Sequence, residues 1–269
     1  MSTAELAPRT TLFLPASNAR AIEKARGLAV DMVLLDLEDA VKPAAKGDAR
    51  TAAVAAAEQG FGNRLCAIRV NAIDSEYYAA DVAAVAASNA DLAVLPKVED
   101  AATAARFADA VGKPMLAMIE TPAGIYAARE IAAVARGLIA GTNDLRATLK
   151  LPATAPRASL SLALQAIVLA ARAEGAWALD GVFNLLDDPA GLEAECVEGR
   201  GLGFDGKTLI HPNQVEIATR AFSPTEAELE EARALVAAAN GGAERFRDRM
   251  IEAMHVDQAK ALLARASRP

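Results

Sequence analysis

The chain has 269 residues, of which 53% are hydrophobic and 23% charged, and its formal net charge at pH 7 is −7. This composition supports a packed core and excludes a disordered chain, and the length suits one large or two small domains. The acidic balance argues against a nucleic-acid-binding protein, which needs a basic surface. No segment approaches the roughly 18 apolar residues of a membrane span, and the amino terminus lacks a secretory-signal pattern. Cys66 and Cys196 have neither metal-site spacing nor a disulfide framework, so we expect a cytoplasmic protein with no membrane partner.

Eight short apolar segments alternate with Ala-rich segments of helical character. The predicted strands are residues 11–15, 31–39, 65–71, 92–99, 114–120, 137–144, 178–184 and 206–211. The predicted helices between and after them are residues 18–29, 44–59, 78–88, 101–111, 124–135, 162–175, 190–201 and 212–221. Nearly all-apolar strands separated by helices indicate a parallel sheet that is covered on its outer face. Eight such units in about 220 residues predict a (β/α)8 TIM barrel. An open doubly wound sheet is the alternative, but its Gly-rich first turn is missing from "LPASNAR".

Two further helices are predicted after the eighth unit, over residues 222–240 and 249–266, with a polar break at 241–248 that begins with two glycines. We therefore expect residues 1–222 to form a catalytic barrel domain and residues 223–269 to form a C-terminal helical arm or lid. The arm is either a cap packed on the barrel or a mobile element that covers an active site, including that of a neighbouring subunit.

Polar side chains gather at the ends of the predicted strands, where the active sites of such barrels lie. They are Asp36, Glu38, Asp39, Arg69, Asn71, Lys97, Glu99, Glu120, Asn143, Asp144, Asn184 and His211. Any one of these acids could instead cap a helix or pair with a neighbouring Arg, so the argument rests on the group.

Two acids in this group, Glu120 and Asp144, follow adjacent strands and have oxygen donors nearby, which predicts a Mg2+ site. The two histidines, His211 and His255, are too few and too far apart for a zinc site. Arg69 suits a bidentate grip on a carboxylate or enolate oxygen. The residues alone therefore predict a metal-assisted enzyme that acts on a small oxyacid.

Seven segments are similar to the citrate lyase beta-subunit-like branch of the HpcH/HpaI aldolase family. They are "LFLPASNARAIEKA", "VLLDLEDAVKPAAKGDAR", "IRVN", "LPKVE", "AMIETPAGI", "GTNDL" and "GKTLIHPNQV", and the likeness runs from about Thr10 to Ala264. The resemblance implies a (β/α)8 barrel, Mg2+ as cofactor with Mn2+ as a substitute, and Claisen-type cleavage or condensation. The implied ligands are a hydroxy-diacid CoA thioester, such as malyl-CoA or citramalyl-CoA, and a small 2-oxo acid.

The resemblance also implies roles for particular side chains. Glu120 and Asp144 fall on the metal ligands, Arg69 on the residue that grips the anion, and Phe13 and Lys24 on thioester-binding positions. Arg69 would stabilise charge developing on the thioester enolate, and Glu38 and Asp39 would orient metal-bound water or Arg69. Lys97 is expected to pair with these acids, because a metal-dependent aldolase needs no Schiff base.

Three positions depart from the family pattern. The turn after the first strand reads "PASN", with Ala16 and Asn18, where relatives have "PG" followed by an Arg. The arm carries Glu252 where relatives have an Asp that reaches a neighbouring site as acid or base, and Asp248-Arg249 replaces the usual Gly before it. We expect a catalytic role for Glu252, with a packing helix as the alternative, and by analogy a homotrimer or dimer of trimers.

The sequence leaves several reactions open besides the C–C lyase. One is hydrolysis of a malyl-type thioester with Glu252 activating water. Another is a citrate lyase beta-type subunit that works on a carrier-protein thioester. A non-CoA hydroxy-oxo-acid aldolase is less favoured, because that branch carries a catalytic His near its second strand and none precedes His211 here. A non-enzymatic binding protein is the remaining alternative.

Overall fold

The computed structural model describes residues 6–239 and 242–266. The chain forms two compact units, one of residues Ala7–Thr219 and one that takes the described residues from Arg220 onward together with Leu6. Gly241, the first residue of the Gly-Gly break, lies outside the described residues. None of the helices in the described part of the chain is long and apolar enough to cross a membrane.

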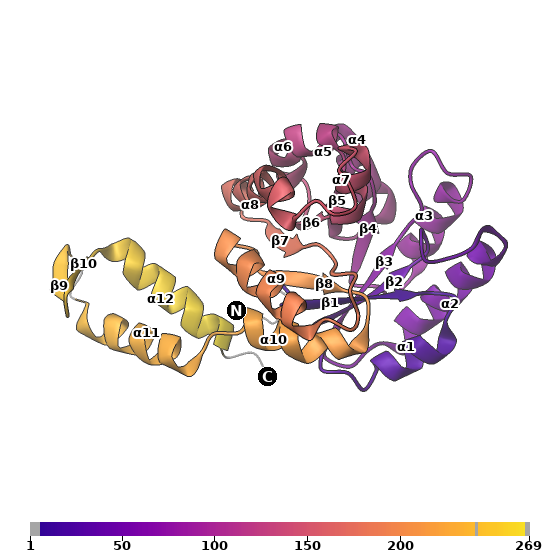
Figure 1. Ribbon diagram of the computed structural model, residues 1–269. Coiled ribbons are helices and arrows are strands. Elements are labelled where there is room, and N and C mark those ends of the chain that lie inside the picture. Colours follow the sequence, from indigo (N-terminus) through magenta and orange to yellow (C-terminus); the bar gives the residue numbers. More distant parts are fainter. Residues whose placement is uncertain (1–5, 240–241, 267–269) are drawn as a thin grey trace. The chain divides into compact units, whose positions relative to one another are not determined.

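The first unit is a closed barrel of eight parallel strands in sequence order, as predicted (Figure 1). The strands are β1 (Thr10–Pro15), β2 (Met32–Asp36), β3 (Leu65–Arg69), β4 (Leu92–Leu95), β5 (Met115–Ile119), β6 (Gly137–Ala140), β7 (Trp177–Asp180) and β8 (Gly206–Leu209). Pairing of Thr10–Leu12 with Lys207–Leu209 joins β1 to β8 and closes the barrel.

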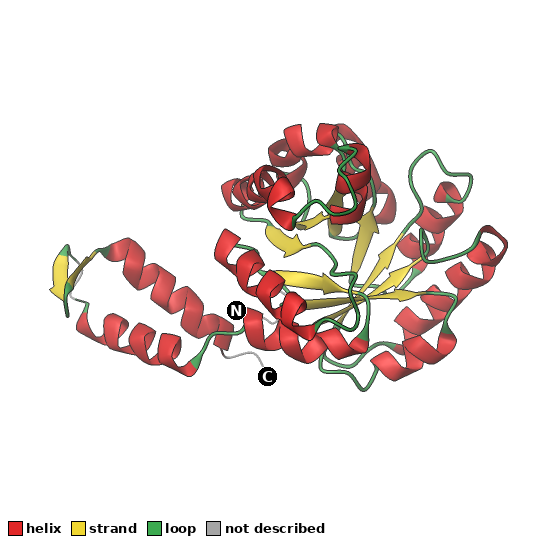
Figure 2. Cartoon of the chain, viewed as in Figure 1, coloured by secondary structure: helices red, strands yellow, loops and turns green. Residues whose placement is uncertain are grey.

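Helices surround these strands, and Figure 2 shows the yellow strands inside the red helices of this unit. The α-helices are α1 (Ala19–Ala25), α2 (Lys46–Gln59), α3 (Tyr78–Ala87), α4 (Ala101–Val111), α5 (Pro122–Tyr126), α6 (Ala128–Ala132), α7 (Thr142–Thr148), α8 (Ser161–Glu174), α9 (Pro189–Leu202) and α10 (Val215–Phe222). Three short 3-10 helices are η2 (Pro43–Ala45), η3 (Arg157–Leu160) and η4 (Pro212–Gln214).

The barrel interior is filled by side chains that alternate along the strands. This core consists of Met32, Leu34, Ala67, Leu92, Val94, Leu116, Met118, Ile139, Trp177 and Leu179, with Phe13 packed against it. Successive side chains of a strand point to opposite faces. The residues two positions after the core residues Leu34, Ala67 and Met118 therefore also face inward, at the carboxyl ends of β2, β3 and β5. These residues are Asp36, Arg69 and Glu120.

The second unit consists of α11 (Glu226–Ala238), a hairpin of β9 (Glu244–Phe246) and β10 (Arg249–Ile251), and α12 (Ala253–Ala266). The prediction of a continuous helix from residue 249 was wrong, because residues 249–251 pair antiparallel with β9. The physical reason is burial: Phe246 and Ile251 are 8% and 1% exposed, and they pack with Leu235 and Ala259 in the core of this unit. A capping box between Thr225 and Glu228 fixes the start of α11.

Candidate active site

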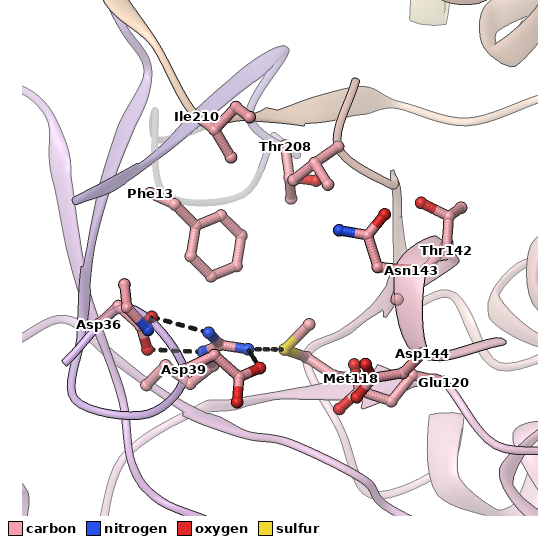
Figure 3. A pocket seen from close by; sticks show the side chains of 15 residues that line it. Phe13, Asp36, Asp39, Met118, Glu120, Thr142, Asn143, Asp144, Thr208 and Ile210 are labelled. Atoms are coloured by element: carbon pink, nitrogen blue, oxygen red, sulfur yellow. Dashed lines mark hydrogen bonds and ion pairs between the residues drawn. The ribbon is translucent and has the colours of Figure 1, made fainter. Parts of the chain in front are cut away.

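A cavity of about 310 Å3 opens at the carboxyl ends of the barrel strands (Figure 3). Its lining residues come from seven of the eight strands or from the segments that follow them, and they are Phe13, Asp36, Asp39, Ala40, Arg69, Met118, Glu120, Ala140, Gly141, Thr142, Asn143, Asp144, Val182, Thr208 and Ile210. Four of these are acids, and Arg69 is the one cation among the described lining residues. The cavity is therefore acidic, although it holds the residues expected to bind an anionic substrate.

Arg69 is the centre of a buried ion cluster. Its Nε and one terminal nitrogen donate to the two carboxylate oxygens of Asp36, each at 2.7 Å. Its other terminal nitrogen lies 2.8 Å from the Glu38 carboxylate and 3.8 Å from that of Asp39. Burial opposes the charge of Arg69, but the hydrogen bonds and charge of Asp36 outweigh it and raise the guanidinium pKa. The side chain is therefore a permanent cation.

This geometry differs from the expected bidentate grip on a substrate. The two parallel N–H groups of Arg69 are committed to Asp36. The remaining nitrogen, which also pairs with Glu38, lies beside Met118 in the cavity lining, with the Met118 sulfur 3.5 Å away. The ring of Phe13 lies 5.1 Å from the guanidinium carbon and covers it. Arg69 can thus offer a substrate oxygen charge and a single hydrogen bond.

The loop after β2 is held in place around Asp36. The carboxylate of Asp36 accepts hydrogen bonds from the backbone N–H groups of Glu38, at 2.9 Å, and Ala40, at 3.1 Å. Glu38 is 5% exposed, and burial raises its pKa despite the charges of Arg69 and Lys97. The side chain of Asp39 is 63% exposed and lines the cavity.

Glu120 and Asp144 lie on the opposite side of the cavity from Asp36 (Figure 3). Glu120 directly follows β5 and is 3% exposed, and burial, with the negative charge of Asp144 adding to it, raises the pKa of Glu120 to about 7. Asp144 lies in the first turn of α7 and its side chain is 36% exposed. The prediction that the β6 strand runs to Asp144 was wrong, because β6 ends at Ala140 and the acid is presented by a helix.

Two backbone features set the position of the Glu120 carboxylate. Gly141 occupies the inward position after Ile139, and a side-chain carbon there would overlap the Cβ and Oε2 atoms of Glu120. On the other side, the backbone N–H of Lys97 donates to Glu120 Oε1 at 2.8 Å. The missing side chain of Gly141 therefore creates the space that the carboxylate fills.

Lys97 has left-handed backbone geometry, with φ of 52°. This conformation costs a non-glycine residue roughly 1–2 kcal/mol. The Lys97 ammonium lies 3.1 Å from Glu38 Oε1 and 3.8 Å from Asp144 Oδ2. The predicted pairing of Lys97 with the acids after β2 is confirmed for Glu38, whose charge outweighs burial and raises the Lys97 pKa.

A buried network behind the Arg69 cluster was missed in the sequence. The Lys46 ammonium donates to the carbonyls of Leu37 and Glu38, each at 2.6 Å, and to the Asn71 side-chain oxygen at 2.5 Å. The amide of Asn71 in turn donates to Asp81 at 2.6 Å. Lys46 belongs to a helix in an Ala-rich segment, where a charged residue normally faces solvent. The sequence pattern therefore did not indicate that this lysine is buried.

The other predicted site residues lie apart from the cavity lining. Lys24 is an exposed residue of α1, and His211 caps η4 through its Nδ1 atom. Asn184 donates to Asn143 at 2.7 Å, which joins the segments after β7 and β6. Glu252 is exposed in the second unit, where its backbone N–H donates to His255 Nδ1 at 3.0 Å.

The candidate metal ligands are the two carboxylates of Glu120 and Asp144. Among the described residues, no group of three or more His, Cys, Asp and Glu side chains is arranged to hold a metal ion. Two carboxylates are nonetheless a common protein contribution to Mg2+, which keeps several water ligands and takes oxygens from the substrate. The donor set of Glu120 and Asp144 therefore fits Mg2+ and does not fit a structural zinc site.

Comparison with known proteins agrees with this architecture. Residues 9–212 match the model of the HpcH/HpaI aldolase/citrate lyase family. The chain is 43% identical to a (3S)-malyl-CoA thioesterase of Cereibacter sphaeroides over 96% of this chain and 94% of that protein. It is 32% identical to the citrate lyase subunit beta of Escherichia coli over 96% of this chain and 93% of that subunit.

Solved structures give the same result. The crystal structure of CitE from Mycobacterium tuberculosis in complex with magnesium, acetoacetate and coenzyme A superimposes with a TM-score of 0.85 at 32% identity, covering 98% of this chain and all of that one. The citrate lyase beta subunit of the same organism, complexed with oxaloacetate and magnesium, gives a TM-score of 0.74 at 33% identity over 83% of this chain. The expected family and barrel fold are confirmed, and the chain belongs to the HpcH/HpaI aldolase/citrate lyase family.

Proposed function

We propose that this protein is a Mg2+-dependent enzyme that acts on the CoA thioester of a hydroxy-diacid of the malyl type, and that it hydrolyses the thioester. The observation that carries the metal site is the pair Glu120 and Asp144. These acids line one cavity, and among the described residues no Lys, Arg or His side chain forms an ion pair with the Glu120 carboxylate. A buried carboxylate without a cation is costly, and a divalent ion compensates both acids.

Charge in the cavity also favours the metal. The substrate brings a carboxylate into a site lined by Asp36, Asp39, Glu120 and Asp144, which would repel it. When bound, Mg2+ would offset the charges of Glu120 and Asp144 and polarise the oxygens of the hydroxy-acid end of the substrate. Mn2+, which takes the same oxygen ligands, is expected to substitute.

The remaining residues have separable tasks. The terminal nitrogen of Arg69 beside Met118 is placed to stabilise negative charge on the thioester oxygen, while Asp36 and Glu38 hold its guanidinium in place. Asp39 carries an exposed carboxylate at the cavity and is placed to orient an attacking water. Phe13, with its ring over Arg69, supplies an apolar wall for the thioester end of the substrate.

Two residues of the proposal, Lys24 and Glu252, lie outside the barrel cavity. Lys24 is assigned to CoA binding by its exposed place on α1, where its charge can meet a phosphate. Glu252 is assigned as an acid or base that residues 223–269, acting as an arm, deliver to the cavity of a neighbouring chain. This role requires an assembly of several chains, such as a trimer. These assignments rest on the family resemblance and on the exposure of both side chains.

Hydrolysis is favoured over C–C cleavage by the relative named (3S)-malyl-CoA thioesterase, which matches nearly the whole chain at 43% identity. Cleavage of the C–C bond of malyl-CoA or citramalyl-CoA is the second candidate, supported by relatives named citrate lyase subunit beta at about one third identity. Both reactions need the same metal, the same binding of the hydroxy-acid end of the substrate and the same stabilisation of negative charge on the thioester oxygen. They differ in the bond that breaks.

One assay separates the two reactions. Purified protein is incubated with malyl-CoA or citramalyl-CoA and Mg2+, and free thiol and 2-oxo acid are measured together. Hydrolysis yields free CoA and the intact hydroxy-diacid, whereas C–C cleavage yields acetyl-CoA with glyoxylate or pyruvate.

Variants in the same assay test the residues. Glu120→Gln and Asp144→Asn are each expected to lower turnover by about 100-fold or more, since each removes a proposed metal ligand. The control is Glu23→Gln, an identical change at a surface acid of α1 that is 76% exposed and pairs with Arg26. Full activity of the Glu120 and Asp144 variants would contradict the proposal.

A further inference from the structure

Lys97 follows the β4 strand and contacts both halves of the candidate site at once. Its backbone N–H donates to Glu120 Oε1 at 2.8 Å, and its ammonium lies 3.1 Å from Glu38 Oε1. Glu38 in turn pairs with Arg69 at 2.8 Å. A single residue therefore connects the proposed metal-ligand side of the cavity to the arginine side.

The backbone of Lys97 is what aims the N–H group. With φ of 52°, the residue adopts the left-handed conformation that glycine accepts freely and other residues rarely adopt. Among the described non-glycine residues, Lys150 and Arg247 also have positive φ, and Lys97 is the one of the three whose N–H donates to an acid of the cavity. Strained backbone that is retained at such a site indicates a role for the geometry itself.

The side chain explains why the position is not glycine. Glycine would provide the same N–H direction without strain, but it has no ammonium to reach Glu38 and Asp144, which lie 3.1 and 3.8 Å from Lys97 Nζ. A lysine supplies the hydrogen bond and the cation from one residue, and these two contributions can be separated by substitution.

We propose that Lys97 is a positioning residue for the metal site, and that its left-handed backbone fixes Glu120 in the orientation in which it shares a divalent cation with Asp144. This inference rests on the proposed function, because it requires that Glu120 and Asp144 bind the cation. The ammonium is a separate element that ties Glu38 to the same loop. It lies 3.8 Å from Asp144 and therefore opposes a cation bound there.

The experiment compares substitutions of Lys97 that all remove the ammonium but differ in how well the new residue tolerates a left-handed backbone. The variants are Lys97→Gly and Lys97→Asn, which accept this conformation, and Lys97→Val, which does not. Affinity is measured directly by titrating Mn2+ and detecting the free ion by electron paramagnetic resonance, and Mg2+ is tested by competition. This readout does not depend on turnover.

Lys97→Gly and Lys97→Asn are expected to bind Mn2+ at least as tightly as the wild-type protein, since the N–H is kept and a competing cation is lost. Lys97→Val is expected to bind about tenfold or more weakly, the usual effect of losing a group that orients a metal ligand. Lys97→Ala, which tolerates the conformation better than Val, should lie between Gly and Val and serves if Lys97→Val does not fold.

The control is Lys150→Val, which places the same residue at a position with φ of 54° outside the cavity lining. It should lower the unfolding temperature and leave Mn2+ affinity unchanged. Equal affinities for the Gly, Ala and Val variants at Lys97 would overturn the positioning role while leaving the metal site intact. Absence of Mn2+ and Mg2+ binding by the wild-type protein would overturn the metal site and this inference together.

Discussion

Replacement of Gly141 by Ala tests how closely the Glu120 carboxylate is fitted to its place. Gly141 has φ of −89° and ψ of 76°, so alanine is not excluded by backbone conformation and the change acts through volume alone. The added methyl carbon would lie 3.0 Å from Glu120 Cδ and overlap its Cβ and Oε2 atoms. Real Cβ atoms do not approach so closely, so the carboxylate or the end of β6 must move.

The size of the effect follows from this overlap. Overpacking of a filled site costs about 1–3 kcal/mol in the free energy of unfolding. Displacement of a metal ligand by an ångström or more should weaken Mg2+ binding by about 10–100-fold. Gly47→Ala is the matched control, because Gly47 lies in α2 and an alanine Cβ there would have no other atom within 4 Å. This alanine should stabilise the helix by about 1 kcal/mol.

The assay is urea unfolding combined with isothermal titration of Mg2+ into each folded variant. We expect Gly141→Ala to lose stability and Mg2+ affinity, and Gly47→Ala to gain stability and keep its affinity. Wild-type stability and wild-type Mg2+ affinity for Gly141→Ala would refute the reasoning, since they would show that Glu120 does not need this space.

Three further predictions concern the surrounding structure. Asp36→Ala leaves the Arg69 cation buried without its bidentate partner and should cost about 3–5 kcal/mol in urea unfolding. Lys46→Met leaves the buried side-chain oxygen of Asn71 without its donor and takes one of two donors from the carbonyls of Leu37 and Glu38, so it should cost about 1–3 kcal/mol in the same measurement. Burial raises the pKa of Cys66 to about 12 and that of Cys196 to about 11, so both thiols stay protonated in the folded protein at pH 9. Iodoacetamide at that pH should modify neither thiol in the folded protein and both in urea, as counted by mass spectrometry; rapid labelling of the folded chain would contradict their burial.

The barrel was predictable because each strand is an almost uninterrupted apolar run between helical segments. The sequence could also indicate Asp36, Arg69 and Glu120, since each ends an apolar strand at the edge where parallel strands finish. Their inward direction is set by alternation with core residues such as Leu34 and Met118, a periodicity that becomes reliable only when the strand register is known.

Other parts of the site depend on contacts between distant segments. Nothing in the sequence shows that Arg69 donates both parallel N–H groups to Asp36, that Lys46 is buried, or that Gly141 makes room for Glu120. The helix that carries Asp144 and the β9–β10 hairpin were also missed, because short polar segments have no distinct periodicity. The choice between thioester hydrolysis and C–C cleavage is likewise absent from the motifs, which concern the proposed metal and oxyacid end of the site.

The most direct test of the metal site is calorimetric titration of Mg2+ into the wild-type protein and into Glu120→Gln and Asp144→Asn. Each substitution keeps the size of the side chain and removes its charge. The two-carboxylate site predicts one bound ion per chain in the wild-type protein and loss of that ion in both variants, with Glu23→Gln unchanged. Binding of equal strength and stoichiometry in all four proteins would contradict the assignment of Glu120 and Asp144 as metal ligands.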